Sequence, residues 1–515
     1  LVGSEMCIRD RAKLMSFGLN GLNGYPINVE VDMHTGVPAC DIVGLADTAV
    51  KEAKERVRLA IRNSGFGFPI GKIAVNLAPA DTKKEGSLYD LAMAIGMLAA
   101  SEQLSCSRLK NKIFLGELSL DGELRRVNGI LPIIISAKQQ GYDNIIIPYG
   151  NKEEAQYIEG LNIYAAHSLT EVYAYLSGAE ELERLEIKSW NFGGEFDESQ
   201  DIKYIKGQFA AKRAMEVAVA GGHNILLIGP PGAGKTMLAR AVPSIMPDLS
   251  FAEALEIAKI HSVAGKLDGF VYSRPFRSPH HTATMPAVTG GGAKARPGEV
   301  SLAHNGVLFL DELPEYQRNL LETLRQPLED KEITVTRSAH TVTYPANFML
   351  IASMNPCPCG NYGSATQECT CSAMQIHNYL SKLSGPLMDR IDIHVEVDSI
   401  SYEDLRDESL SEDSASVRAR VNAARELQKV RYASAGIYSN AQMNNAQIKE
   451  FCRIDDESAA LIKTSFEKFR MSARAYNRIL KVARTIADLE ACEKISSAHV
   501  AEAIQYRTLD KKYNV

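Results

Sequence analysis

A glycine-rich segment, GPPGAGKT, has the spacing of a phosphate-binding loop. It directly follows the apolar run 224–228, which predicts a buried strand, and it precedes a segment with helical spacing. Its glycines allow the backbone to curl so that N–H groups and a helix N-terminus face a phosphate. Lys235 would then reach the β- and γ-phosphates, and Thr236 would offer a hydroxyl ligand to Mg²⁺. The pattern predicts an ATP site lined by Gly229, Pro230, Pro231, Gly232, Ala233, Gly234, Lys235 and Thr236.

Two acidic residues follow a second apolar run. Residues 307–310 are apolar without interruption, as is typical of a parallel strand buried on both faces, and Asp311 and Glu312 come next. Carboxylates at the end of such a strand face the ligand crevice. We expect Asp311 to hold Mg²⁺ through water and Glu312 to activate the attacking water as general base. A third strand, 348–353, leads to Asn355, whose amide would position that water.

The elements that position these residues predict an α/β protein of several domains. The chain has 515 residues, 45% of them hydrophobic and 23% charged, which is ordinary globular composition for about three domains. We expect residues 1–14 to be a non-native or disordered leader before a start at Met15. An α/β domain is expected over 15–190, a nucleotide-binding core over 191–398 and a helical domain over 399–515.

The overall charge excludes a uniformly basic nucleic-acid binder, because the formal net charge is −6. Any contact with DNA must therefore be focused on a local surface. The sequence contains neither an apolar run of about 18 residues nor an evident targeting segment. We therefore expect a cytoplasmic protein that does not cross a membrane.

Four of the nine cysteines crowd into one short segment. Cys357 and Cys359 form one CxC pair, and Cys369 and Cys371 form a second. Four thiolates at this spacing could surround a zinc ion, and a reducing compartment favours metal binding over a disulfide. Free buried thiols and a redox switch remain alternatives.

The order of these motifs resembles that of the Mg-chelatase-like AAA+ ATPases of the YifB/ComM group. The resemblance covers the chain from Met15 onward. It is carried by NGYPINVEVD, GLADTAVKEAKERVRLAI, KGQFAAKRAMEVAVAGGHN, PFRSPHHTAT, GEVSLAHNGVLFLDELPE, MNPCPCG and GPLMDRIDIHVEV. It implies an AAA+ P-loop αβα core, an N-terminal α/β domain similar to the Lon protease fold, and a C-terminal helical lid.

The resemblance also implies a ring, usually hexameric, with ATP bound between subunits. Arg390 then corresponds to the arginine finger that reaches the neighbour's γ-phosphate, and Arg474 corresponds to the second sensor. For both arginines the alternative is a surface salt bridge.

The N-terminal domain lacks the residues that Lon-type proteolysis requires, a serine nucleophile and a lysine that accepts its proton. In KKEGSLYDLAMA, Leu88 stands where the serine is expected, and Ser87 is one residue early. Leu131 stands near the place of the lysine. We therefore expect an inactive relative of the protease fold, with an unconventional site at Ser87 as the alternative.

Two cationic loops are candidates for contact with DNA in the pore of the ring. The segment TGGGAKARPGE carries Lys294 and Arg296, and EITVTRSAHTVTYP predicts a β-hairpin with Arg337 and His340 near its turn. In related ring helicases such a hairpin points into the pore. The alternative is a pair of solvated loops that serve assembly. The histidines of PFRSPHHTAT are expected to have a loop or interface role rather than to bind metal.

These features favour an ATP-driven DNA translocase or branch-migration helicase acting in recombination or natural transformation. The alternative is an ATPase of the protein-remodelling or metal-chelatase type, which does not translocate DNA. An ATP-dependent protease is disfavoured by Leu88 and Leu131.

Overall fold

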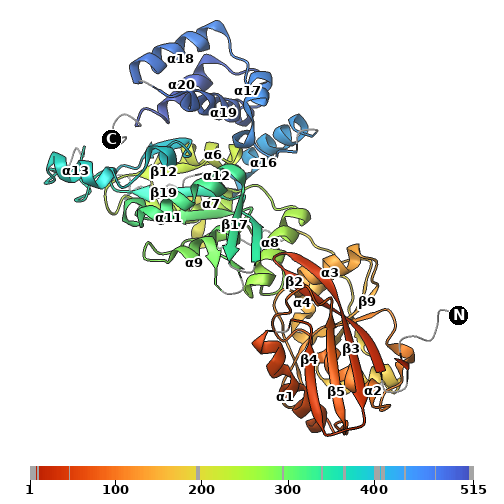
Figure 1. The fold of residues 1–515 in the computed structure, drawn as a ribbon. Coiled ribbons are helices and arrows are strands. Elements are labelled where there is room, and N and C mark those ends of the chain that lie inside the picture. Colours follow the sequence, from red (N-terminus) through yellow and green to blue (C-terminus); the bar gives the residue numbers. More distant parts are fainter. Residues whose placement is uncertain are drawn as a thin grey trace. The chain divides into compact units, whose positions relative to one another are not determined.

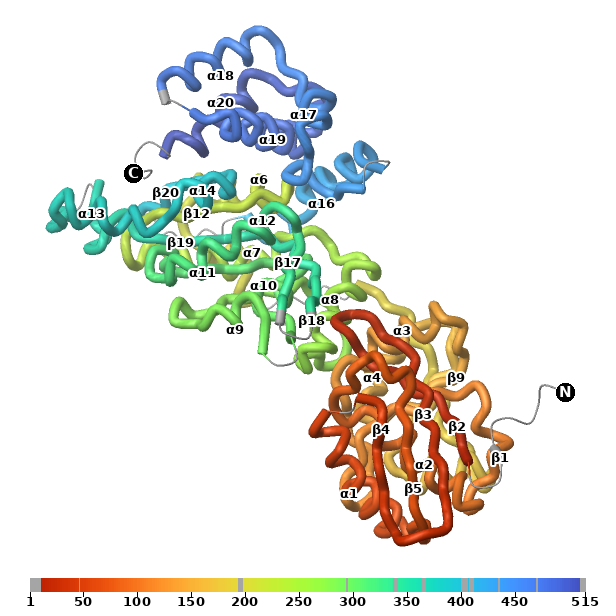
Figure 2. Tube along the Cα trace, viewed as in Figure 1, coloured from red at the N-terminus to blue at the C-terminus, as the bar shows by residue number. Residues whose placement is uncertain are grey.

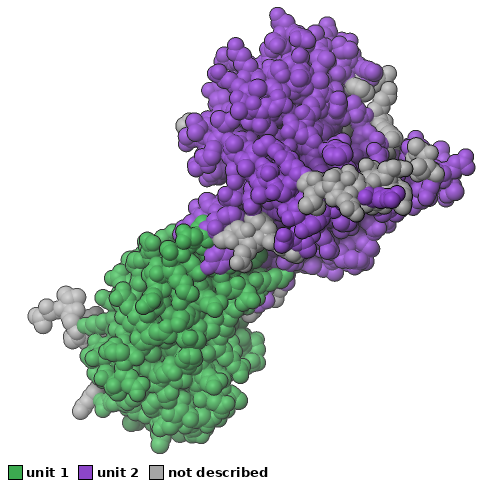
Figure 3. All heavy atoms as spheres, turned by 180° about the vertical axis from the view of Figure 1, so that it is seen from behind, with its two compact units in different colours: residues 1–191, 255–271 green, residues 192–254, 272–515 purple. Residues whose placement is uncertain are grey.

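The computed structural model describes residues 7–8, 11–45, 47–192, 198–292, 295–337, 340–363, 367–399, 406, 412–433, 436–469 and 471–509. For residues 7–8, 337, 340 and 469 it describes the backbone alone. The chain divides into two compact units, which are coloured separately in Figure 3. Unit 1 contains residues 1–191 and 255–271, and unit 2 contains residues 192–254 and 272–515. Residues 255–271, which the sequence places in the nucleotide-binding core, therefore pack with unit 1.

Unit 1 is built on a nine-stranded mixed sheet. The first two long strands form an antiparallel hairpin, and alternate residues of β2, such as Ala12 and Leu14, are buried. Because β2 begins at Arg11, residues 11–14, which we expected in a disordered leader, are part of the sheet. The strands of the sheet are β1 (Cys7–Ile8), β2 (Arg11–Asn20), β3 (Asn23–His34), β4 (Ala39–Val43), β5 (Lys72–Ala78), β6 (Lys112–Phe114), β9 (Asn144–Pro148), β10 (Asn162–Ala166) and β11 (Glu183–Arg184). A separate short hairpin joins β7 (Glu117–Leu118) to β8 (Leu124–Arg125).

The helices of unit 1 begin and pack as their sequences predict. Helix α1 begins where the Asp47 side chain accepts a hydrogen bond from the Val50 N–H, a standard N-cap. Every residue of α2 is buried, as expected for a helix packed into the core of its unit. The helices are α1 (Thr48–Asn63), α2 (Asp90–Ala100), α3 (Ile130–Gln139), α4 (Lys152–Ala155) and α5 (Leu169–Ser177).

Unit 2 contains a five-stranded sheet in which all neighbouring strands are parallel. Its strands in spatial order are β13 (Phe276–Arg277), β16 (Val307–Leu310), β19 (Met349–Met354), β12 (Ile225–Ile228) and β20 (Ile393–Glu396). Three of them, β12, β16 and β19, are buried throughout, which explains their unbroken apolar sequences. The strand order reverses at β12, so the carboxyl end of β12 is a topological switch point, where ligands of such sheets bind.

The helices of the sheet region and two small hairpins complete the first part of unit 2 (Figure 1). The helices between the start of unit 2 and the lid are α6 (Phe209–Gly221), α7 (Lys235–Ile245), α8 (Phe251–Ala264), α9 (Met285–Thr289), α10 (Glu299–Leu302), α11 (Arg318–Thr323), α12 (Arg325–Asp330), α13 (Ala373–Leu380) and α14 (Gly385–Met388). Of these, α8 belongs to unit 1 from residue 255 onward. The hairpins are β14 (Gly290–Gly291) with β15 (Arg296–Pro297), and β17 (Glu332–Arg337) with β18 (His340–Pro345).

The C-terminal part of unit 2 is helical, and α20 packs against both α18 and α19 (Figure 2). Its helices are α16 (Ser414–Arg431), α17 (Asn445–Phe451), α18 (Asp456–Phe469), α19 (Ala473–Leu489) and α20 (Ser497–Gln505). One continuous hydrophobic core joins the strands, α6 and α7 to α16 and α19. Among the described residues, none of the helices combines the length and apolarity that a membrane span needs.

Candidate functional site

The glycine-rich loop lies between β12 and α7, at the switch point of the sheet. Gly229 is pressed against the neighbouring backbone, because a Cβ there would lie 2.1 Å from the carbonyl oxygen of Val397. Gly234 has a φ of 87°, a left-handed conformation that favours glycine, and α7 begins at the next residue. The strand, loop and helix therefore follow in the order that a phosphate-binding loop requires.

Lys235 is held inside this loop. Its ammonium group donates hydrogen bonds to the carbonyl oxygens of Gly229 (2.7 Å) and Pro230 (2.9 Å), and to Oδ1 of Asn355 (3.1 Å). Burial lowers the pKa of Lys235, and the nearby carboxylates of Asp311 and Glu312 oppose that shift. Asn355 comes directly after β19, the neighbour of β12, and this adjacency brings the two side chains together.

Asp311 and Thr236 form a set of oxygen atoms suited to Mg²⁺. The Thr236 hydroxyl donates a 3.0 Å hydrogen bond to Oδ2 of Asp311. The other carboxylate oxygen accepts the Ser353 hydroxyl and a 3.1 Å hydrogen bond from the Glu312 N–H. A hydroxyl and a carboxylate beside a phosphate-binding loop are hard ligands of the type Mg²⁺ prefers. These residues therefore fit the ion that an ATP site needs.

Glu312 is placed differently from Asp311. Its backbone is left-handed, with a φ of 53°, and its side chain is 57% exposed. The closest ionisable partner recorded for its carboxylate is Nδ1 of His281, at 3.9 Å. The His281 ring packs against that of His280, whose Nδ1 contacts the Thr282 hydroxyl at 2.8 Å. The exposed carboxylate next to Asp311 has the freedom that a group acting on an attacking water needs.

Two further residues, which the sequence analysis did not single out, form hydrogen bonds with residues of the nucleotide site. Gln208 donates hydrogen bonds to the carbonyl oxygens of Ala233 (3.3 Å) and Asp398 (2.6 Å), so it ties the loop to the end of β20. Ser353 contacts both Asp311 and the Glu312 N–H. Both residues are common polar types, and only the tertiary fold shows their roles.

The structure places Arg390 in the interior of unit 2. It follows α14, its side chain pairs with Glu329, and it donates a 2.5 Å hydrogen bond to the Pro386 carbonyl. Arg474, at the start of α19, is exposed and pairs with Asp389 at 3.6 Å. None of these recorded partners belongs to the nucleotide site.

The two candidate DNA loops are hairpins that pack against each other. The Tyr344 hydroxyl, on β18, donates a 2.9 Å hydrogen bond to the Ala295 carbonyl beside β15. Arg296 is exposed on β15, and its charge opposes the burial that raises the pKa of Tyr344 to about 12. Arg337 and His340 face each other in the β17–β18 ladder next to its turn. Lys294 lies outside the described residues.

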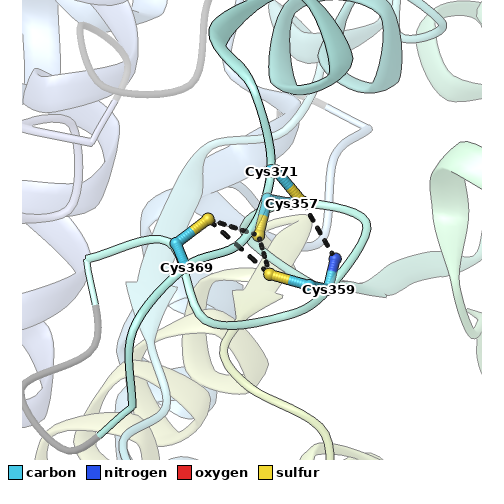
Figure 4. Close-up of side chains that lie close together, drawn as sticks. All are labelled: Cys357, Cys359, Cys369 and Cys371. Carbon is cyan, nitrogen blue, oxygen red and sulfur yellow. Dashed lines mark hydrogen bonds between the residues drawn. The ribbon is translucent and has the colours of Figure 1, made fainter.

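The structure brings the four clustered cysteines together (Figure 4). Their sulfur atoms all lie within 4.8 Å of one another, and all four thiols are free. Cys357 is fully buried, whereas Cys359, Cys369 and Cys371 are half-buried.

In unit 1, the side chains near the expected protease site make other contacts. The Ser87 hydroxyl donates to the carboxylate of Glu117. The buried ammonium group of Lys84 donates to the carbonyl oxygens of Pro79 and Thr82. Leu88 and Leu131 are buried apolar residues. These recorded contacts do not include a pairing of Ser87 with a lysine.

Three family models match the chain. Residues 201–405 match the family described as magnesium chelatase, subunit ChlI, and residues 29–151 match subunit ChlI of Mg-chelatase. Residues 411–507 match the C-terminal region of magnesium chelatase subunit ChlI.

Curated relatives cover nearly the whole chain. Competence protein ComM of Haemophilus influenzae is 44% identical over 496 residues, which are 95% of this chain and 96% of that protein. YifB of Escherichia coli is 44% identical over 495 residues, with the same coverage. Lon protease 2 of Bacillus subtilis is 31% identical over 124 residues, 24% of this chain and 22% of the protease. The chain therefore belongs to the Mg-chelatase-like AAA+ ATPase family that includes ComM and YifB.

Proposed function

We propose that the chain is one subunit of a cytoplasmic homo-oligomeric ring, a hexamer, that hydrolyses ATP and moves on DNA. Its physiological role is branch migration during recombination or natural transformation. The observation that carries the DNA part is the packing of two hairpins, β14–β15 and β17–β18, on the same unit as the nucleotide site. The name of the relative from Haemophilus influenzae, a competence protein, also supports a role with DNA.

The ATP chemistry follows from the contacts around the loop. Thr236 and Asp311 would hold Mg²⁺, which neutralises charge on the phosphates when bound. Lys235 would exchange its carbonyl partners for phosphate oxygens while staying close to Asn355. Glu312 would accept a proton from the attacking water, and Asn355 would orient that water.

Arg390 is proposed to act between subunits. Arg474 is proposed to act between the core and the lid of one subunit. Arg390 would serve as the finger that reaches the neighbour's γ-phosphate, and Arg474 as the second sensor. The Arg474–Asp389 pair supports a link between them, since Asp389 directly precedes Arg390. A movement of α19 would then shift Asp389 and, with it, Arg390.

The DNA contacts are proposed to come from the hairpin cations. Arg296, Arg337, His340 and Lys294 would meet the phosphate backbone, and repetition around a ring would multiply their effect. Such a local cationic surface could bind DNA even though the formal net charge of the subunit is −6.

We further propose three domains, with an inactive Lon-like domain at 15–190, the core at 191–398 and the lid at 399–515. The three family matches and the short similarity to Lon protease 2 support this division. The contacts of Ser87 and Lys84 with other groups support the absence of protease activity.

The second candidate is an ATPase of the metal-chelatase or protein-remodelling type without DNA translocation. It is favoured by the description of the matching family, a magnesium chelatase subunit. In that case the hairpins would contact a protein partner.

The test is ATP turnover of the full chain without DNA, with single-stranded DNA and with a four-way junction. We expect DNA to stimulate turnover, and Arg296→Ala and Arg337→Ala to weaken both this stimulation and DNA retention. Lys449→Ala, which removes an exposed lysine of the helical region, is the matched control. Equal turnover in all three conditions, with no DNA retained, would favour the second candidate.

A further inference from the structure

The cysteine cluster has the dimensions of a metal site. The Sγ atom of Cys357 lies 3.4 Å from that of Cys359 and 3.7 Å from that of Cys369, and the Cys359–Cys369 distance is 3.6 Å. Four sulfur atoms placed tetrahedrally around zinc, with bonds of about 2.3 Å, are separated by about 3.8 Å. The recorded distances therefore match a tetrathiolate site closely, and the sulfur of Cys371 completes the set.

The four cysteines of the cluster are free thiols in the structure. A disulfide requires sulfur atoms about 2.05 Å apart. Thiols also prefer soft cations, and a tetrahedral set of four sulfur ligands is typical of zinc. Magnesium, the ion expected at the ATP site, takes oxygen ligands instead. The cluster is thus chemically distinct from the Mg²⁺ ligands Thr236 and Asp311.

Backbone N–H groups already point at two of the sulfurs. The Tyr362 N–H donates to the Cys357 sulfur at 3.3 Å. The Cys359 N–H donates to the Cys371 sulfur at 3.4 Å, as Figure 4 shows. Four thiolates carry two negative charges more than Zn²⁺ neutralises, and such N–H donors offset part of that excess. These two donors would therefore stabilise thiolates at Cys357 and Cys371.

The cluster is also joined to the nucleotide site. Cys357 is two residues after Asn355, and Gly360 lies against the P-loop, since a Cβ there would be 2.4 Å from Cδ of Pro231. On the other side, Cys371 immediately precedes the Ser372 cap of α13. The four cysteines therefore lie between Asn355, which follows β19, and the first residue of α13.

We infer that Cys357, Cys359, Cys369 and Cys371 bind one zinc ion, and that this ion fixes the loop that holds Asn355 against Lys235. The metal site itself is independent of the proposed function, whereas its effect on ATP hydrolysis rests on that function.

The first experiment measures metal content of the purified full chain by mass spectrometry. We expect about one zinc ion per chain in the parent, and about tenfold less in Cys359→Ser and Cys371→Ser. Cys492→Ser is the matched control, because Cys492 lies outside the four-cysteine cluster, beside Glu490 and His499. Zinc that is absent from the parent, or lost only in Cys492→Ser, would overturn the assignment.

A second measurement does not depend on the variants folding. The parent chain, stripped of metal and loaded with Co²⁺, should show the intense absorption of tetrahedral cobalt bound to thiolates, and added Zn²⁺ should remove it. Spectra of octahedral cobalt alone would contradict the site.

The effect on the nucleotide site is tested with the same stripped protein. We expect ATP turnover to fall by about 10- to 100-fold, because small displacements of a positioning group have effects of that size. Binding of a fluorescent ATP analogue should change much less, and Zn²⁺ should restore turnover. Unchanged turnover in stripped protein would overturn the proposed effect. A chain that binds zinc but never hydrolyses ATP would instead contradict the proposed function and leave the metal site intact.

Discussion

The guanidinium group of Arg390 pairs with the carboxylate of Glu329 inside the same chain. The arginine is only 9% exposed, whereas the Glu329 side chain is 54% exposed. If Arg390 acts on a neighbour's γ-phosphate, this pair must open when the ring assembles, because a guanidinium group cannot keep its full contact with Glu329 and reach another subunit. On that proposal, the position paired with Glu329 is the retracted one.

Replacement of this arginine tests the proposed role. Arg390→Ala should lower ATP turnover by about 10³-fold or more, since it removes transition-state charge stabilisation. ATP affinity should change by only about twofold, because the P-loop is untouched. Turnover and binding of a fluorescent ATP analogue are measured on the same assembled preparation. Glu329→Gln, which removes the intrachain partner, should keep turnover at or above the parent level.

Mixing two inactive variants separates a finger from a structural arginine. Rings formed from Arg390→Ala and Lys235→Ala subunits contain some interfaces with an intact P-loop and an intact Arg390 from the neighbour. Partial recovery of turnover in the mixture is expected. Parent-like turnover of Arg390→Ala alone, in assembled rings, would show that Arg390 is not the finger.

Replacing Lys235 and replacing Glu312 should impair different steps, ATP binding for the first and ATP hydrolysis for the second. Lys235→Ala should weaken ATP binding by about tenfold or more, since a charge-assisted contact with phosphate is lost. Glu312→Gln should keep binding but lower turnover by about 10²- to 10⁴-fold, the range for loss of a general base. Nucleotide titration and turnover distinguish the two. A Glu312→Gln chain that hydrolyses ATP at the parent rate would rule out the general-base role.

Asp392 predicts an acid-sensitive contact between core and lid. Its carboxylate, whose side chain is 13% exposed, contacts His223 at 3.0 Å and Arg478 at 3.1 Å, and the charge of Lys481 also acts on it. Burial would raise the pKa of Asp392, but the hydrogen bond with His223 and the charges of Arg478 and Lys481 together hold it well below its usual range. The folded state thus binds fewer protons than the unfolded state, whose aspartate pKa is about 3.9. The stabilisation is complete above about pH 5 and is lost as the pH falls from about 4 toward the folded pKa.

The corresponding variant is Asp392→Asn. It should lower the free energy of unfolding by about 3 kcal/mol at pH 7, because it leaves buried cations without their partner. In calorimetry, the melting temperature should fall by about 5–10 °C at pH 7, and the difference should shrink toward pH 2. Glu450→Gln, at an exposed position of α17, should have little effect. A constant difference across the pH range would exclude Asp392 as the titrating group.

Local patterns predicted the strands and loop of the nucleotide site, because each depends on contiguous residues. The apolar runs before Gly229 and Asp311 became buried parallel strands, and the adjacency of β12 and β19 brought Lys235 to Asn355. The contacts of Gln208 and the partner of Arg390 depend on residues far apart in the chain. No sequence period encodes such contacts, so reasoning from one sequence could not predict them.

Gly360 approaches Pro231 closely, so a larger residue at position 360 should displace the P-loop. Gly360→Ala places a methyl group 2.4 Å from Cδ of Pro231, at a φ of 86°. Gly436→Ala is the matched control, since its φ is 66° but nothing lies within 4 Å of the added Cβ. Both variants carry the left-handed backbone cost of about 1 kcal/mol, so only the clash differs. We expect Gly360→Ala to weaken ATP binding and turnover by about tenfold, as a displaced P-loop would, while Gly436→Ala stays near the parent. Equal nucleotide titrations for the two variants would mean that the cysteine loop does not constrain the P-loop.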